Sequence, residues 1–287
     1  MIAISGIVFT FFMVFGGYLL AGGKLDIILK SLPFELMMIG GAAIGAFALS
    51  NSAHTIKITL RDVKKVFSGS LWKLNDYTLL MTTLHDLLQI AKRNPVALES
   101  HIDEPGESYI FKNFPEVVND HTAIDMICDT LRTGTMNYSD PHQIEDLLDK
   151  KIEEKKHHQE ISVHALQAVA DGLPALGIVA AVLGVIKTMG SIDQPPEVLG
   201  KLIGGALVGT FLGVFLAYCL VAPFAAKVKS SADEDINFYR AIREVLVSFY
   251  QNHPVQTCIE VARQSIPHDL RPDFEMLSTA IRASKRE

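Results

Sequence analysis

The residue types that carry out chemistry in proteins are present in this sequence, but they form no recognisable metal-binding pattern. His157, His158 and His164 follow Glu153 and Glu154 in a charged stretch. The stretch lacks the HExxH spacing that places two histidines on one helix face around zinc. A run of charges like this is typical of a solvated helix face. We therefore expect no metal ion here.

The cysteines argue against redox or zinc chemistry as well. Cys128, Cys219 and Cys258 are isolated and have no CxxC spacing, so they indicate neither a disulfide framework nor a zinc site. The sequence has no GxxxxGK[ST] phosphate-binding loop and no nucleophile–base arrangement. We predict that the protein is not an enzyme and holds no cofactor.

Acidic residues are absent from the interior of the apolar blocks, and this absence is the most informative feature. Glu35 and Asp171 lie at the edges of blocks. A protein that moves protons usually needs a titratable carboxylate at membrane depth. The chain therefore either handles no ions or takes this carboxylate from another subunit.

The apolar blocks themselves predict an all-α integral membrane protein with four transmembrane helices. The chain has 287 residues, of which 49% are hydrophobic and 20% charged, and the apolar residues are concentrated in stretches long enough to cross a bilayer. The third stretch, Gly172–Ile186, reaches full length when it is extended to Ile192 with Lys187 at the interface. The other spans are Met1–Gly23, Leu36–Ala53 and Leu202–Ala226.

Positive residues predict that the polar segments are cytoplasmic. Positive residues are more frequent directly after the second and fourth spans than in the short connections between paired spans. Those that follow the two spans are Lys57, Arg61, Lys64, Lys65, Lys227 and Lys229. The predicted organisation is a first transmembrane hairpin (residues 1–53), a large helical cytoplasmic domain (54–170), a second transmembrane hairpin (171–226) and a helical cytoplasmic tail (227–287). Both termini are then cytoplasmic. The formal charge of −6, without a basic stripe, argues against nucleic acid as a partner.

The predicted cytoplasmic domain, residues 54–170, is expected to be helical. Asp76 is expected to cap a helix with apolar residues at three- and four-residue steps, and Asn94-Pro95 to end it. Ser139-Asp140-Pro141 is expected to start another helix, which continues through Lys150–Glu160 into the third span.

Small residues within the spans predict close helix packing. Gly205, Gly209 and Gly213 recur every four residues in the fourth span, and Gly41 and Gly45 do so in the second. Without side chains, helix backbones approach closely and gain dispersion contacts. The spacing leaves open whether these contacts lie within one subunit or between subunits.

Pro174 and Pro223 are candidate hinges in the third and fourth spans. Each removes a backbone donor and frees the carbonyl four residues earlier, although a proline near a helix end can also be neutral. Thr210 is the hydroxyl in the middle of the fourth span, where it can bond back to its own helix or line an ion path.

Several segments resemble the MotA proteins of the MotA/TolQ/ExbB proton channel family, in the expected order and over nearly the whole chain. The strongest is the third-span motif ADGLPALGIVAAVLG at residues 170–184. The others are IGGAA at 39–43, LESHIDEP at 98–105, PPEVLG at 195–200 and ALVGTFLG at 206–213.

This resemblance implies a stator subunit of the bacterial flagellar motor, in the inner membrane. Five MotA subunits surround two MotB spans in that family, and MotB carries the proton-accepting aspartate and a peptidoglycan-binding domain. Ion flow is coupled to movement of the MotA ring, whose cytoplasmic part pushes on the rotor protein FliG. A carboxylate supplied by the partner accounts for its absence here.

The resemblance also implies roles for individual residues. Arg93 and Glu99 match the charged rotor-contact positions, Pro174 and Pro223 the conformationally important prolines, and Thr210 the hydroxyl that faces the ion site.

The resemblance also indicates which ion the protein uses. Sodium-type relatives have threonine at the position of Ala181, and a methyl group removes one of the several oxygen ligands that sodium needs. Protons are therefore favoured over sodium.

Three other functions remain open from the sequence. A TolQ- or ExbB-type energiser of outer-membrane processes is related, but such proteins have three spans. A stand-alone channel or transporter is disfavoured by the absence of in-span charges. The third is a purely structural scaffold, and under this hypothesis Pro174→Ala and Glu99→Lys should leave function intact.

Overall fold

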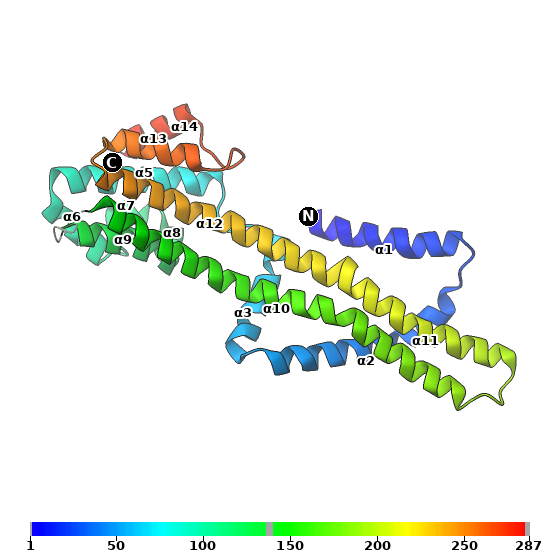
Figure 1. Cartoon of the computed structure of the whole chain (residues 1–287). Helices are drawn as coiled ribbons and strands as arrows, with labels where there is room; N and C mark the ends of the chain where they lie inside the picture. Colours follow the sequence, from blue (N-terminus) through cyan, green and yellow to red (C-terminus); the bar gives the residue numbers. More distant parts are fainter. Residues whose placement is uncertain (1, 136–139, 285–287) are drawn as a thin grey trace. The chain divides into compact units, whose positions relative to one another are not determined.

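The computed structural model describes residues 2–135 and 140–284, which form helices joined by turns (Figure 1). No strand occurs in these two ranges, which confirms the expected all-α fold. Within the same residues, four helices are long and apolar enough to cross a membrane, in agreement with the four predicted spans.

The chain divides into two compact units, Met1–Gly69 with Gln159–Ser231 and Ser70–His158 with Ala232–Glu287. The first unit contains the apolar spans. Its helices are α1 (Ile2–Leu20), α2 (Leu25–Ser50), α3 (Ala53–Val63), α4 (Lys65–Ser68), the second part of α10 (Pro141–Met189), α11 (Pro196–Leu216), the π-helical η1 (Ala217–Val221) and the first part of α12 (Ala222–Tyr250).

In the first unit, α10 and α11 lie side by side, and α2 packs along α11 (Figure 1). Ile39, Leu173 and Leu212 form the centre of this packing. Helix α1 approaches α11 through aromatic rings, with Phe11 edge-on to Phe215 at a centroid distance of 5.1 Å. Most other large apolar side chains of α1 are exposed, as expected for a helix that faces lipid.

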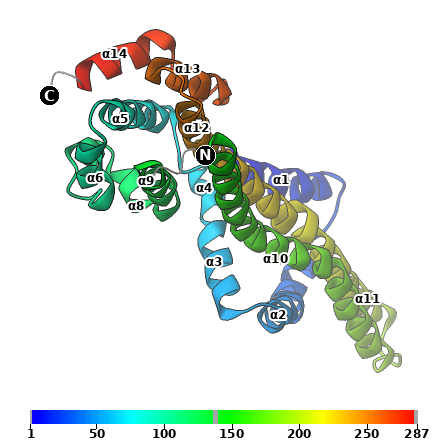
Figure 2. The same cartoon turned by 60° about the vertical axis from the view of Figure 1, so that its left-hand side comes forward.

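The second unit has a hydrophobic core of its own. Its helices are α5 (Leu74–Arg93), α6 (Pro95–Asp103), α7 (Tyr109–Lys112), α8 (Pro115–Asn119), α9 (His121–Thr135), the first part of α10, most of α12, α13 (Val255–Ser265) and α14 (Phe274–Ser284). The ring of Trp72 stacks on Phe238 at 3.8 Å, and α5 packs against α13 and α14 (Figure 2). Burial of these aromatic and aliphatic side chains holds the short helices together.

Local signals set the ends of α5. Asn94 Oδ1 accepts the N–H of Ala97 at 3.2 Å, and α6 begins at Pro95, so the predicted break at Asn94-Pro95 is confirmed. Asp76 caps α5 as predicted. It lies in the first turn of α5, where its Oδ2 accepts the N–H of Lys73 at 2.8 Å.

The third span belongs to a single helix of 49 residues, α10, which confirms its predicted continuation through Lys150–Glu160. The helix begins at Pro141, and Asp140 Oδ1 accepts the N–H of His142 at 3.0 Å. Ser139 lies outside the described residues. The fourth span likewise continues as helix, through η1 and α12 to Tyr250.

Candidate functional site

Helices α10 and α11 meet through small residues. A Cβ built on Gly177 would lie 2.8 Å from the carbonyl oxygen of Gly209, and one built on Gly184 would lie 2.7 Å from the Cβ of Ala206. Real Cβ atoms do not approach other atoms so closely, so glycine is required at both positions. The glycines of the fourth span thus pack within this chain, against α10 at Gly209 and Gly213.

Glu35 lies inside α2 and is buried, with 5% of its surface exposed. The helix that contains the second predicted span therefore includes a buried carboxylate on the amino-terminal side of its uncharged stretch. The uncharged stretch predicts a span from Leu36, whereas α2 begins at Leu25. The helix accommodates Pro33 in its interior and places Asp26 and Lys30 one turn apart, 3.1 Å between Oδ2 and Nζ.

Ala181 and Thr210, the predicted ion-path residues, lie on adjacent parts of α10 and α11. A Cβ on Gly209, which precedes Thr210, would lie 3.2 Å from the backbone nitrogen of Ala181. Both residues are half-buried. One helical turn earlier on α11, a Cβ on Gly205 would lie 3.0 Å from Ser31 Oγ of α2.

The two prolines occupy different settings. Pro174 lies inside α10 and is half-buried. Pro223 is exposed in the first turn of α12, directly after η1, where the N–H of Ala222 donates to the carbonyl of Ala217 five residues earlier. Pro223 and Cys219 also line a cavity of about 740 Å³ in this unit. A π-helical turn next to a proline is a common origin of helix bending.

Arg93 and Glu99 lie at the surface of the second unit. Arg93 is the last residue of α5, Glu99 is in the middle of α6, and both are exposed. The turn at Asn94 brings the two helices into contact. The arrangement offers one positive and one negative side chain on consecutive helices to an external partner.

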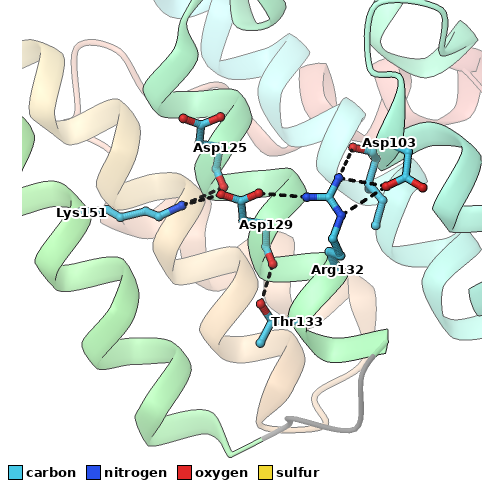
Figure 3. A network of polar contacts seen from close by, with 7 residues as sticks. Asp103, Asp125, Asp129, Arg132, Thr133 and Lys151 are labelled. Carbon is cyan, nitrogen blue, oxygen red and sulfur yellow. Dashed lines mark hydrogen bonds and ion pairs between the residues drawn. The ribbon is translucent and has the colours of Figure 1, made fainter.

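A network of charged groups joins the end of α6 to α9, and α9 to α10 (Figure 3). The Arg132 guanidinium donates to Asp103 Oδ1 at 2.9 Å, to the carbonyl of Ile102 at 3.1 Å and to Asp129 Oδ1 at 3.0 Å. Lys151 of α10 donates to Asp129 Oδ2 at 3.1 Å. The hydrogen bonds with Asp103 raise the pKa of Arg132, so the guanidinium group stays positively charged.

Two family models match the chain. Residues 4–95 match the motility protein A N-terminal model, and residues 120–241 match the MotA/TolQ/ExbB proton channel family. Motility protein A of Escherichia coli (strain K12) is 35% identical over 286 residues, covering 99% of this chain and 96% of that protein. The chain belongs to the motility protein A family. Chemotaxis protein LafT of Vibrio parahaemolyticus is another relative, 35% identical over 273 residues and 95% of each chain.

Solved structures share the fold of this motility protein A family member. The structure of C. jejuni MotAB has a TM-score of 0.73 at 21% identity, covering 93% of this chain and 96% of that one. The flagellar MotAB stator complex from Bacillus subtilis has a TM-score of 0.71 at 21% identity, covering 94% and 98%.

Other predicted positions of this chain lie apart from these contacts. Among the described residues, no atom outside the local helix lies within 4 Å of a Cβ on Gly41 or Gly45. His157, His158 and His164 are exposed on α10.

Two features of the structure do not follow from the sequence patterns. The i,i+3 spacing of Asp129 and Arg132 indicates a local pair, but nothing in the sequence connects that pair to Asp103. The buried position of Glu35 within a helix could be predicted only if the second helix were allowed to begin before Asp26 and Lys30.

Proposed function

We propose that this chain is a stator subunit of a bacterial flagellar motor. Together with a MotB-type partner, it couples proton flow across the inner membrane to torque on the rotor. The observation that carries this proposal is the 35% identity to motility protein A across nearly the whole chain. The likeness to MotAB structures supports a partner of the MotB type.

In the proposed mechanism, the partner's aspartate accepts the proton next to α10 and α11, near Ala181 and Thr210. Protonation and deprotonation of that carboxylate change the charge next to α10 and α11, and this change alters how the two helices pack. In this mechanism, Pro174 and Pro223 act as hinges that allow α10 and α12 to move. One charge crossing 100 mV is worth roughly 2.3 kcal/mol, so torque comes from repeated small steps. The methyl group of Ala181 supports protons over sodium.

The second unit is proposed to be cytoplasmic and to push on FliG through Arg93 and Glu99, with both termini on the same side. Positive residues after the second and fourth spans support this orientation. Exposed charges on short helices suit a fast, reversible contact, because each surface pair contributes little affinity. The proposed assembly is a ring of five copies around two MotB-type spans.

The test is rotation of tethered cells that lack their own stators and express this chain with its MotB-type partner in sodium-free buffer. Rotation that stops on addition of a protonophore is expected. Rotation only after sodium is supplied would overturn the proton assignment and keep the stator. No rotation with either ion, with both proteins in the membrane and a matched rotor, would overturn the stator proposal and favour a TolQ-type energiser.

A further inference from the structure

The Glu35 carboxyl group has an unusual environment for an acidic side chain. It is 95% buried in the first unit, in a helix long and apolar enough to cross a membrane. Its Oε2 atom has no hydrogen-bond partner in the described part of the chain. A carboxyl group at such a position costs stability, so its presence calls for a function.

The side chain of Glu35 lines a cavity of about 460 Å³ formed by α2, α10 and α11. The cavity is large enough for water, and its polar lining includes Ser31. Its charged lining groups, besides Glu35, are Lys30 from α2, Lys187 from α10 and Lys201 from α11, all of which are exposed. Lys187 precedes the end of α10 and Lys201 follows the start of α11. Water can thus reach the carboxyl group from the end of the helices where α10 connects to α11.

On its other side, Glu35 reaches the seam between α10 and α11. A Cβ on Gly209 would lie 2.7 Å from Glu35 Oε2, so a side chain at position 209 would displace the carboxyl group from its present place. The same point is 3.2 Å from the backbone nitrogen of Ala181. Glu35 Oε2 therefore lies at the edge of the cavity, next to the backbone of α11 at Gly209 and of α10 at Ala181.

We infer that Glu35 is a second proton-accepting residue of the ion path, contributed by this chain in addition to the partner's aspartate. The inference rests on the proposed function, since it assumes ion flow along these helices. Water in the cavity delivers a proton to the Glu35 carboxylate, which becomes a carboxylic acid. The acid then releases that proton toward the partner's carboxylate, and the Glu35 carboxylate is restored. Only O–H bonds form and break, and no oxidant or reductant is needed.

The test compares Glu35→Gln, which keeps the shape and loses the titratable proton, with Glu35→Asp, which keeps a carboxyl group. Glu197→Gln is the matched control, because Glu197 is an exposed acid in the first turn of α11. Each full-length variant is expressed with its MotB-type partner in stator-free cells, and its amount in the membrane is measured. Rotation speed is the first measurement. The second is infrared difference spectroscopy of the purified complex in lipid vesicles at two pH values, which detects the carbonyl band of a protonated carboxyl group.

Glu35→Gln is expected to slow rotation by about tenfold or more at equal membrane level, in line with the loss of a positioned proton-transfer group. Glu35→Asp is expected to keep part of the speed, and Glu197→Gln to match the unaltered chain. The unaltered complex is expected to show one pH-dependent carbonyl band from Glu35 besides that of the partner's aspartate. The Glu35 band should shift in Glu35→Asp and be lost in Glu35→Gln, while the partner's band remains in both.

Full rotation of Glu35→Gln would overturn the inference and leave Glu35 with a structural role. If Glu35→Gln fails to assemble, the spectra of the unaltered complex and of Glu35→Asp decide, and the absence of any carbonyl band that shifts between them overturns the inference. Failure of the unaltered chain to drive rotation would instead count against the proposed function, and the spectra would still test Glu35.

Discussion

Gly213 of α11 lies against Gly177 of α10 so closely that a Cβ on Gly213 would stand 2.7 Å from the Gly177 Cα. The same Cβ would lie 2.7 Å from the carbonyl oxygen of Leu173. Both neighbours are backbone atoms, which cannot rotate away as a side chain can. The helices must therefore separate to admit any side chain at this position.

We predict that Gly213→Ala destabilises the first unit by about 1–3 kcal/mol, the usual cost of overpacking. Thermal unfolding of the purified chain with its partner in detergent measures this. Gly41→Ala is the control, because in the described chain a Cβ there meets nothing within 4 Å. Alanine is favoured over glycine in helices, so the control should be neutral or slightly stabilising. Equal losses of stability in the two variants would contradict a role for the close approach.

Features set by local sequence were predictable. Asn94-Pro95 ends α5 because proline disfavours a helical conformation at the residue before it, and Pro141 suits a first helical turn. The continuation of α10 into the third span follows from the absence of any breaker across Lys150–Glu160.

Features set by tertiary contacts were not predictable. Glu35 was assigned to a span edge because hydropathy ends a span at the first charges. In the structure, α2 begins at Leu25 and so includes Asp26 and Lys30. The absence of a side chain at Gly209 leaves space for the Glu35 carboxyl group. Arg132 and Asp103 are 29 residues apart on different helices, and no periodicity relates them.

We predict that Arg132→Ala destabilises the second unit by about 1 kcal/mol, because the partly exposed guanidinium makes charge-assisted hydrogen bonds that solvent weakens. Arg132→Lys should not restore the loss, because an ammonium group cannot span Asp103, Asp129 and the Ile102 carbonyl together. Denaturant unfolding followed by the fluorescence of Trp72, the only tryptophan, measures both. The control is Arg282→Ala, at an exposed position of α14. Full stability of Arg132→Ala would show that the network contributes nothing.

His101 is predicted to make the second unit sensitive to acid. Burial lowers the pKa of this imidazole from its ordinary 6.5, and its Nδ1 lies 2.9 Å from Ser108 Oγ. The unfolded chain then binds the proton more tightly than the folded chain. The contribution to stability is present above pH 6.5 and is lost as the pH falls through the lower folded pKa.

The expected slope is at most about 1.4 kcal/mol per pH unit. Trp72 unfolding curves at a series of pH values below neutrality measure the slope, which His101→Gln should remove. His157→Gln, an exposed histidine, should keep the slope of the unaltered chain. An unchanged slope in His101→Gln would assign the acid sensitivity to another group.

Cys128 is predicted to resist alkylation in the folded chain. Burial raises the pKa of its thiol to about 12, so almost no reactive thiolate is present at mildly alkaline pH. Iodoacetamide labelling followed by mass spectrometry should modify Cys128 only after denaturation. Labelling of the folded chain at the rate seen in denaturant would contradict the burial of this side chain.

Charge reversal at Glu99 is predicted to lower torque without loss of the stator complex. Glu99 is exposed on α6, so Glu99→Lys removes no core contact, and the purified complex with the MotB-type partner should be recovered in normal amount. Exposed ion pairs are worth roughly 0.2–1 kcal/mol, so one reversal should weaken the rotor contact and leave some rotation. Glu275→Lys, an exposed reversal on α14, is the control and should rotate normally. The measurement is the rotation speed of tethered cells at equal membrane levels. Loss of the complex itself, or equal loss of speed in the control, would count against a specific rotor contact at Glu99.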